Sequence, residues 1–327
     1  MVSSFFLRIF VFMSLKKLPI LFVFGPTAVG KTDFVEQLGL KAPIEIINMD
    51  STQCYTPLTI GTAKHDWKSF VVPCHLFDSI NEPRHQTVAE YRERALVLIN
   101  SIQKRGNIPV FVGGSGFYLM SLLYPPHSES SNSLVQSHGS WDDLYSIDPE
   151  RAQLIHKHDQ YRINRALSIW HQTGLKPSLY EPLLNPPSDC LLLFLTRDRQ
   201  ELKDRIAARV RIMMKQEFIK EVRSLDTSWR SFVRDKKIIG YAQVLDYLES
   251  DQSAHAYNAM IDAIIQKTAA YAKRQETFWR SLTKKLPTTC IKNGSVIHIN
   301  TDVINLTLSG LDLYIKQLLD RLLNPVN

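Results

Sequence analysis

Residues Gly25 to Thr32 read G-P-T-A-V-G-K-T, which is a P-loop motif. The motif follows an apolar run and opens a stretch with helical periodicity, the context that a working P-loop needs. Backbone N–H groups of such a loop surround phosphate oxygens at a helix N-terminus, the lysine adds a positive charge, and the threonine hydroxyl can hold Mg²⁺. The motif predicts a phosphate-chain site made of Gly25, Pro26, Thr27, Ala28, Val29, Gly30, Lys31 and Thr32.

Two more groups of polar residues follow apolar runs. Asp50 ends I-E-I-I-N-M-D, and Gly113, Gly114 and Ser115 follow I-P-V-F-V. The carboxyl ends of parallel strands meet at one crevice, so we expect Asp50 to face the phosphate site, where a carboxylate can bind metal or activate a hydroxyl. The glycines allow close backbone approach, and Ser115 can cap the next helix or offer its hydroxyl to a ligand.

Lys64 and His75 lie in segments, L-T-I-G-T-A-K-H-D and P-C-H-L-F-D-S, that show no helical or strand periodicity. Each side chain can face the crevice, lie on the surface or pack inside. The sequence leaves these three interpretations open.

Along the chain, β-branched runs alternate with segments of helical periodicity, and these elements must position the groups described above. This alternation predicts an α/β fold: a P-loop NTPase-like parallel sheet flanked by helices, with a short inserted segment and a helical C-terminal half. The expected strands are 19–25, 44–50, 108–114, 190–196 and 288–306, and the expected helices are 31–41, 87–106, 115–124, 148–174, 199–225, 259–282 and 309–323.

Changes in composition divide the chain into five parts. The first is an extension that is either disordered or the product of an upstream start codon, and the segment before residue 148 is polar and rich in Ser and His. The parts are the N-terminal extension 1–18, a P-loop core of 19–116 plus 148–198, an insertion at 117–147, a basic helical part at 199–285, and a strand and helix at 286–327.

The composition excludes some classes of protein. The chain has 39 Lys+Arg against 32 Asp+Glu, a net charge of +7, which fits either a solvated surface or a polyanionic partner. Its four cysteines form no C-x-x-C pair, so we expect reduced thiols of a cytoplasmic protein and no disulfide framework. No uncharged apolar run reaches 18 residues, so we expect no membrane span.

The order of the motifs is more specific than any one of them. GPTAVGKT, DSTQ at 50–53, IGTAK at 60–64 and GGSGFY at 113–118 are followed by DPERAQLIHKHDQYRINRAL, IIGYAQ and YAKRQETFWR. This ordered set resembles the tRNA dimethylallyltransferases, the isopentenyltransferases that modify adenosine 37 beside the anticodon. The resemblance covers roughly residues 20 to 285.

The resemblance implies that the P-loop binds the diphosphate of dimethylallyl diphosphate rather than ATP. The expected reaction transfers the dimethylallyl group to N6 of adenosine 37, in tRNAs that read codons starting with U, and releases diphosphate. Asp50 matches the family's general base, and Lys31, Thr32 and Ser115 match other catalytic positions, with Mg²⁺ as cofactor held through Thr32. Arg205 and Arg209 lie four residues apart on one expected helix face, from which an arginine can reach the diphosphate.

The resemblance also implies a monomeric enzyme that does not associate with a membrane. Its expected partner is the anticodon stem-loop of tRNA. The target base must leave its stack, and backbone phosphates supply affinity. By motif matching, the expected tRNA-binding residues are Asp50, Ser51, Thr52, Gln53, Ser115, Tyr161, Arg162, Ile163, Asn164, Arg165, Gly240, Tyr241, Lys273, Arg274, Gln275 and Arg280.

The chain departs from the family pattern at three places. The insertion 117–147 is shorter than usual and contains no arginine, Ala269 stands where an arginine is common, and Glu217 replaces a frequent glycine. None of these departures touches the P-loop or Asp50.

Three alternative functions remain. A small-molecule P-loop kinase explains the P-loop and Asp50 but not the later motifs. An isopentenyltransferase acting on free adenine nucleotides shares the core motifs but does not need the segment 161–165. A non-catalytic RNA-binding P-loop protein is expected to lose Asp50 or Lys31, and both are present.

Overall fold

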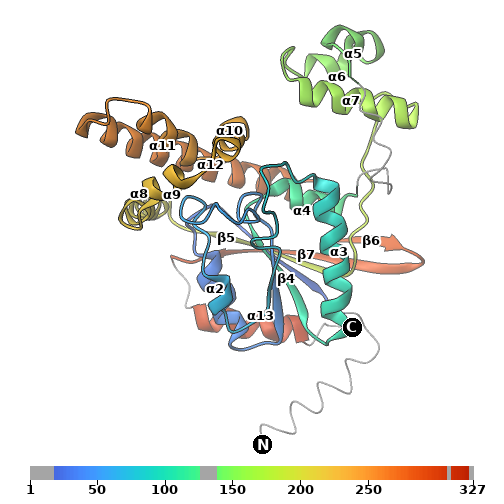
Figure 1. The fold of residues 1–327 in the computed structure, drawn as a ribbon. Helices are drawn as coiled ribbons and strands as arrows, with labels where there is room; N and C mark the ends of the chain where they lie inside the picture. Colours follow the sequence, from blue (N-terminus) through green and yellow to red (C-terminus); the bar gives the residue numbers. More distant parts are fainter. Residues whose placement is uncertain (1–17, 126–137, 308–310, 324–327) are drawn as a thin grey trace, which may run out of the picture. The chain divides into compact units, whose positions relative to one another are not determined.

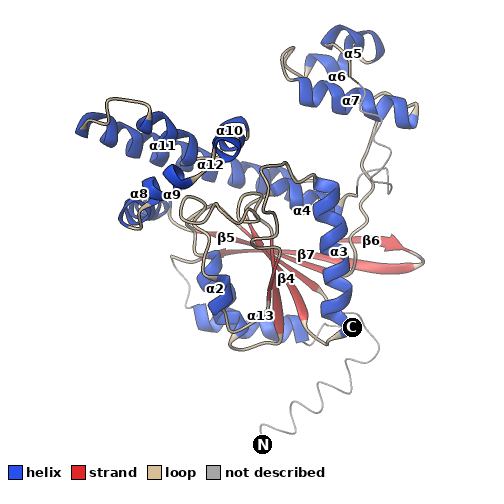
Figure 2. Cartoon of the chain, in the orientation of Figure 1, coloured by secondary structure: helices blue, strands red, loops and turns tan. Residues whose placement is uncertain are grey.

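The computed structural model describes residues 18–125, 138–307 and 311–323 (Figure 1). Its seven-stranded sheet has the order β3-β2-β4-β1-β5-β7-β6, and every neighbouring pair is parallel except β6 and β7. Figure 2 shows the strands as red arrows. The predicted α/β class with a mainly parallel sheet is confirmed. The strands are β1 Ile20–Phe24, β2 Ile44–Asn48, β3 Cys74–His75, β4 Ile108–Gly113, β5 Cys190–Thr196, β6 Thr289–Lys292 and β7 Ser295–Asn305.

The helices flank the sheet and form most of the segment between β5 and β6. They are α2 Lys31–Gly39, α3 Val88–Lys104, α4 Gly116–Leu123, α5 Trp141–Ile147, α6 Pro149–Gln153, α7 Gln160–Thr173, α8 Arg199–Lys215, α9 Phe218–Ser224, α10 Thr227–Asp235, α11 Tyr241–Leu248, α12 Ala254–Thr283 and α13 Leu311–Leu323, with a 3₁₀ turn at Trp67–Ser69. The interpretation of 1–18 as an extension falls almost wholly outside the described residues.

Three predicted elements are each split in two. The single strand expected at 288–306 is a hairpin, because Asn293 and Gly294 take left-handed backbone angles and reverse the chain. The helix expected at 199–225 breaks at Glu217, which has a φ of 66°. The helix expected at 148–174 is interrupted before Asp159, whose side chain accepts the Arg162 N–H and caps a new helix.

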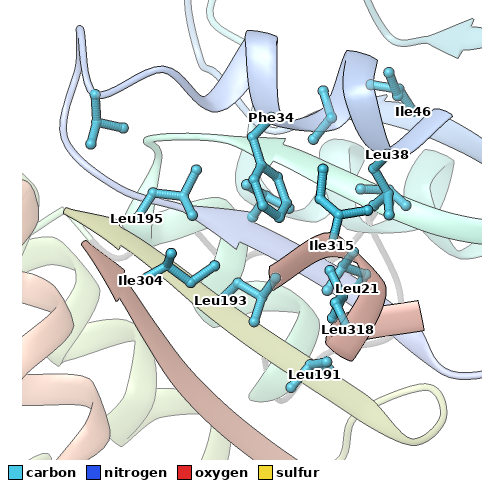
Figure 3. Packing of buried hydrophobic residues seen from close by; sticks show 14 of the residues in the cluster. Leu21, Phe34, Leu38, Ile46, Leu191, Leu193, Leu195, Ile304, Ile315 and Leu318 are labelled. Atoms are coloured by element: carbon cyan, nitrogen blue, oxygen red, sulfur yellow. The ribbon is translucent and has the colours of Figure 1, made fainter. Parts of the chain in front are cut away.

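One face of the sheet packs against α2 and α13. Successive residues of a strand point to opposite faces, so Leu21 of β1 and Leu193 of β5 share this face. Figure 3 shows Phe34 and Leu38 of α2 and Ile315 and Leu318 of α13 converging on the strand residues. The packing fixes the start of α2, and with it the loop that precedes this helix.

The other face of the sheet is aromatic. Phe22 stacks on Phe111 with ring centroids 5.0 Å apart, and Trp279 of α12 stacks on Phe194 of β5 at 5.0 Å. Aromatic pairs of this kind contribute roughly 0.5–1.5 kcal/mol beyond the area they bury. Trp279 is thus a core residue, as its helical position indicates, and it anchors the C-terminal part of α12 against the sheet.

The chain forms two compact units, residues 123–185 and the remainder. The smaller unit contains α5, α6 and α7 and has its own core, in which Leu144 and Ile155 pack against Ile163 and Leu167. Trp141 closes this core and donates its indole N–H to the carbonyls of Ala152 and Ile155, both at 3.0 Å. Residues 148–185 belong to the same compact unit as α5, whereas we expected them in the P-loop core. Part of the expected insertion, 126–137, lies outside the described residues.

The four cysteines are all described and form no disulfide. In the described part of the chain, no helix is long and apolar enough to cross a membrane.

Candidate active site

The P-loop joins β1 to α2 and is shaped by two left-handed residues, Ala28 and Gly30, with φ of 65° and 106°. The Lys31 Nζ donates to the carbonyls of Gly25 and Pro26, both at 2.9 Å. Burial and, to a smaller extent, the neighbouring Arg209 lower the pKa of Lys31 to about 7, while Asp50 opposes part of the shift. The loop thus holds a buried cation that an anionic ligand would stabilise in its charged form.

Asp50 is held beside the P-loop by its neighbours. The Asn48 side chain accepts the Asp50 N–H at 2.9 Å and donates to the carbonyls of Asp50 and Leu76, at 3.2 and 3.1 Å. The Thr52 N–H and hydroxyl both donate to Oδ1 of Asp50, at 2.9 and 2.6 Å. Within the described residues, Oδ2 of Asp50 accepts no hydrogen bond. Asp50 also lines a cavity beside the P-loop, so this oxygen is available to a substrate. Asn48 is a positioning residue that the sequence does not reveal.

Three arginines from the end of β5 and from α8 contact the P-loop. Arg205 Nε donates to the Ala28 carbonyl at 2.9 Å, and Arg209 Nη1 donates to the Thr27 hydroxyl at 3.2 Å. Both were expected near the phosphate site. Arg197, which was not expected, donates to the Val29 carbonyl at 2.7 Å. The sequence feature that could have identified Arg197 is its position directly after the strand β5.

The site has two adjoining cavities. The first, here called the P-loop cavity, is lined by P-loop residues Thr27, Ala28, Lys31 and Thr32 together with Asp50 and Gln53. The second, the helical cavity, has a volume of about 370 Å³ and is lined by Ser51 and Thr52 and by residues of α8, α12 and the turn 236–239. The two cavities share Thr27, Asp50, Thr62, Ala63 and Arg209. Asp50 therefore lies where a phosphate-linked group and a second substrate would meet.

Gln275 of α12 connects the P-loop to the end of β4. Its Oε1 accepts the Thr27 N–H at 2.9 Å and its Nε2 donates to the Gly114 carbonyl at 3.0 Å. A Cβ on Gly114 would lie 1.8 Å from this amide nitrogen, so only glycine fits there. Gln275 is 4% exposed, and its bonds give it a positioning role in this conformation. Its expected direct contact with tRNA stays a prediction.

A second positioning contact joins α9 to the loop after β2. The Glu221 carboxylate accepts the backbone N–H groups of Thr59, Ile60 and Gly61 at 3.2, 2.7 and 3.3 Å, and also the Tyr241 hydroxyl at 2.6 Å. A Cβ on Gly61 would lie 2.2 Å from the Phe218 ring, so the loop fits against α9 only with glycine here. Tyr241 is fully buried and has a structural role here, while the expected tRNA contact at Gly240 and Tyr241 stays a prediction.

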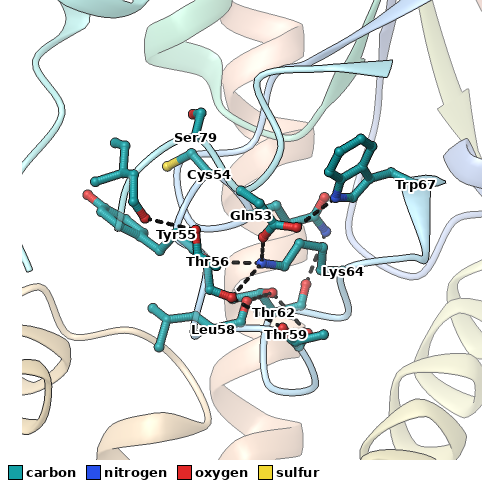
Figure 4. Close-up of polar contacts among 12 residues, drawn as sticks. Gln53, Cys54, Tyr55, Thr56, Leu58, Thr59, Thr62, Lys64, Trp67 and Ser79 are labelled. Atoms are coloured by element: carbon teal, nitrogen blue, oxygen red, sulfur yellow. Dashed lines mark hydrogen bonds and ion pairs between the residues drawn. The ribbon is translucent and has the colours of Figure 1, made fainter. Parts of the chain in front are cut away.

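The same loop is fixed at its other end by Lys64. The Lys64 ammonium is buried, forms an ion pair with Asp78 and donates to the carbonyls of Tyr55 and Thr56, at 2.8 and 3.3 Å (Figure 4). Gln53 Nε2 donates to the Thr62 carbonyl at 3.1 Å. Of the three interpretations of Lys64, internal packing is therefore the correct one.

His75 is partly buried and contacts a buried carboxylate. Its Nε2 lies 2.7 Å from the buried carboxylate of Glu45, which Arg105 and Asn107 also contact. Burial raises the pKa of Glu45, but these hydrogen bonds outweigh it and hold the value at about 2.

The other expected site residues divide by exposure. Tyr161, Arg162 and Arg165 are exposed on α7 of the smaller unit, and Lys273, Arg274 and Arg280 are exposed on α12. These side chains are free to contact a polyanion. Ile163 is part of the core of the smaller unit, and Ser115 is buried and lines neither cavity.

A mainly parallel α/β sheet carries a P-loop after β1, and a carboxylate that follows β2 lines the same cavity. This combination defines a P-loop protein with a site for a phosphate-linked substrate. The model of the family described as IPP transferase matches residues 53–282, and that of the family described as Isopentenyl transferase matches residues 18–70. The chain belongs to the IPP transferase family. The resemblance drawn from the motifs is thus confirmed, and so is the expected class of enzyme, a transferase that modifies tRNA.

Curated relatives and solved structures agree. The tRNA dimethylallyltransferase of Petrotoga mobilis is 36% identical over 282 residues, which are 80% of this chain and 91% of the relative, and that of Thermoanaerobacter sp. (strain X514) is 34% identical over 80% and 88%. The tRNA isopentenylpyrophosphate transferase of Bacillus halodurans is 27% identical with a TM-score of 0.62, covering 92% of this chain and 94% of that one. A eukaryotic dimethylallyltransferase acting on tRNA, 23% identical with a TM-score of 0.72 over 93% and 78%, shares the fold.

The depressed pKa of Lys31 predicts a pH-dependent affinity for anions. Below pH 7 the free lysine is already charged, whereas above pH 7 an anion must bind together with a proton, so affinity should fall as pH rises. Sulfate is a suitable probe because it stays a dianion across this range. Calorimetry between pH 6 and 9 should show weakening and proton uptake above pH 7, and Lys31→Met should remove the pH dependence. A flat profile in the unaltered protein would contradict the assignment.

The Glu221 contact predicts a local change on substitution. Glu221→Gln places an amide NH₂ where a carboxylate oxygen accepts N–H and O–H groups, which should lower the free energy of unfolding by about 1–3 kcal/mol. Hydrogen exchange at the amides of residues 59–61 should become faster. Glu217→Gln, which alters an exposed glutamate beside the same helix, is the control and should leave those amides protected. Unchanged exchange in both variants would exclude the contact.

Proposed function

We propose that the protein transfers the dimethylallyl group from dimethylallyl diphosphate to N6 of adenosine 37 in tRNAs that read codons starting with U, releasing diphosphate. One observation carries the proposal: the P-loop residues Lys31 and Thr32 and the carboxylate of Asp50 line one cavity, which adjoins a second. The names of the curated relatives support the same donor and acceptor.

The reaction needs a leaving group, an acceptor and a base. The lone pair of N6 forms a bond to C1 of the dimethylallyl chain while the C1–O bond breaks and its electron pair leaves with the diphosphate. Lys31, Arg209 and the P-loop N–H groups stabilise the negative charge on the departing oxygens. The proton lost by N6 passes to the Asp50 carboxylate, whose Oδ1 is already held by Thr52 while Oδ2 faces the substrate.

Mg²⁺ fits this site as a partner of the diphosphate. Thr32 and Asp50 both line the P-loop cavity and offer the oxygen ligands that this ion prefers. No cluster of three or more His, Cys, Asp or Glu side chains suited to a metal occurs in the described part of the chain, which suits an ion held chiefly by diphosphate and water. Thr32 would bind the ion, which neutralises charge on the leaving group.

The walls of the helical cavity suit a five-carbon chain beside a polar base. Val210 and Met213 of α8 and Ile238 and Ile239 of the following turn form its apolar side, and Ser51 and Thr52 form a polar side. A purine can be read by these hydroxyl groups while the apolar residues exclude water from the allylic carbon. A kinase acceptor would not need such an apolar wall, which favours prenyl transfer over the kinase alternative.

RNA is favoured over a free adenine nucleotide as acceptor. Tyr161, Arg162 and Arg165 present an exposed aromatic and basic surface on α7, and Lys273 and Arg280 do so on α12. An acceptor as small as AMP offers a single phosphate, whereas the many phosphates of an RNA would pair with several exposed basic side chains. A single chain carries all of these groups, so we propose that it acts as a monomer in the cytoplasm.

A label-transfer assay tests the function directly. The protein is mixed with labelled dimethylallyl diphosphate, Mg²⁺ and either an anticodon stem-loop with adenosines at 36–38 or AMP. Label in the RNA alone is the expected result. Label in AMP alone would move the protein to the free-nucleotide branch, and ATP hydrolysis with label in neither acceptor would indicate a kinase.

The general-base role of Asp50 predicts a selective defect. Asp50→Ala should lower the turnover number by about 10²- to 10⁴-fold with little change in RNA affinity, because it removes the proton acceptor and no phosphate contact. Single-turnover rates and RNA binding isotherms measure the two effects separately. Equal losses in rate and affinity would refute the role.

A further inference from the structure

Lys236 has no role in the site described so far, yet it lines the helical cavity. It follows directly after α10, in the turn that leads to α11, and its backbone N–H bonds to the Phe232 carbonyl at 2.9 Å. Asp50, Ser51 and Thr52 line the same cavity. Lys236 therefore lines the same cavity as the polar residues beside which the acceptor base is proposed to bind.

The surroundings of Lys236 hold its charge without neutralising it. The ammonium lies 5.4 Å from the ring centroid of Tyr55 and 5.8 Å from that of Phe232, so two aromatic faces position it. Among the described residues, no carboxylate lies within ion-pair distance of Lys236. Burial lowers its pKa, and the nearby Cys54 and Asp50 groups counteract part of that shift.

The helical cavity as a whole carries more positive charge than its assigned ligands require. Its described lining includes Arg209, Lys236, Lys237 and Arg274 and a single carboxylate, Asp50. Arg209 is directed to the P-loop through its bond to Thr27. The remaining cations line a region that is proposed to hold an uncharged hydrocarbon chain and an uncharged purine. Neither of these groups carries a negative charge that could pair with the cations.

Neither end of the donor supplies that group. Lys31 and Thr32, which hold the diphosphate, line the P-loop cavity and not the helical one. The dimethylallyl end of the donor has no charge. The acceptor nucleotide, in contrast, brings a phosphate attached to its ribose, and a lysine point charge on a flexible stem is well suited to bind it.

We propose that Lys236 binds the phosphate of the acceptor nucleotide and so holds its base against Asp50. The inference rests on the proposed function and deepens it, because it assigns a residue to the phosphodiester next to the target adenosine. Lys236 is a binding residue in this account and takes no part in proton transfer.

A double-mutant cycle between protein and RNA tests the assignment. Two anticodon stem-loops carry a 2′-deoxyribose at the same linkage beside the target adenosine; one has a normal phosphate there and the other an uncharged methylphosphonate. The linkages on the 5′ and 3′ sides are tested in turn. The measured quantity is kcat/KM for RNA, at saturating dimethylallyl diphosphate, for the unaltered enzyme and for Lys236→Met.

At one of the two linkages, the unaltered enzyme should lose about tenfold in kcat/KM when the charge is removed, the effect of one charge-assisted hydrogen bond. Lys236→Met should lose about tenfold with the normal RNA and lose little more with the methylphosphonate. Lys236→Arg should restore most of the loss, and Lys104→Met, an exposed charge-matched control on α3, should behave as the unaltered enzyme. The KM for dimethylallyl diphosphate should not change.

Three results would overturn the proposal. They are equal rates for Lys236→Met and the unaltered enzyme, additive losses in the cycle at both linkages, and a raised KM for dimethylallyl diphosphate with a normal response to RNA. If Lys236→Met does not fold, Lys236→Gln replaces it in the same cycle. Failure of the proposed function is distinct, since the unaltered enzyme would then transfer no label to either RNA.

Discussion

The site depends on how closely the ends of β1, β2 and β4 approach one another. In the parallel register, Phe24 of β1 pairs with Gly113 of β4, and Asn48 of β2 pairs with Val112. A Cβ on Gly113 would lie 2.1 Å from the Met49 carbonyl oxygen, which leaves no room for a side chain. This contact brings Asp50, two residues after the end of β2, to the P-loop that follows β1. Sheet geometry, rather than any one hydrogen bond, therefore sets the distance between Asp50 and the P-loop.

The helical half completes a site that the sheet only begins. Helix α8 directs Arg205 and Arg209 to P-loop carbonyl and hydroxyl groups, α9 holds the loop 59–61 through Glu221, and α12 supplies Gln275. Each contact joins residues that are 160 to 248 positions apart in the chain. Bringing such distant residues together costs conformational entropy on folding, but it leaves the folded site with little freedom to rearrange. That rigidity suits a reaction that must keep water from an activated allylic carbon.

The sequence predicts the parts of the molecule whose signals are local. The P-loop, the four central strands and the position of Asp50 follow from short motifs and from strand ends, and the ordered motifs indicate the family. Gln275 and Tyr241 were assigned to tRNA by motif matching, and their burial could not be predicted because a motif does not say whether its side chains are buried. Glu221, Asn48 and Lys236 went unassigned because their partners are set by tertiary packing. The break at Glu217 has one sequence signal, the glycine that is frequent at this position in the family, because glycine favours the left-handed backbone angle that Glu217 adopts.

The helix α12 presents two faces within a single turn. Lys273 and Arg274 are exposed to solvent, whereas the next residue, Gln275, is buried and bonded to the Thr27 N–H of the P-loop. A shift or rotation of α12 on docking of a polyanion would carry this amide with it and alter the loop that holds the diphosphate. The two binding events are then thermodynamically linked, and linkage is reciprocal: whatever RNA does to the affinity for the prenyl donor, the donor does to the affinity for RNA. An enzyme built in this way can discourage reaction of its activated donor with water until the nucleic acid has arrived.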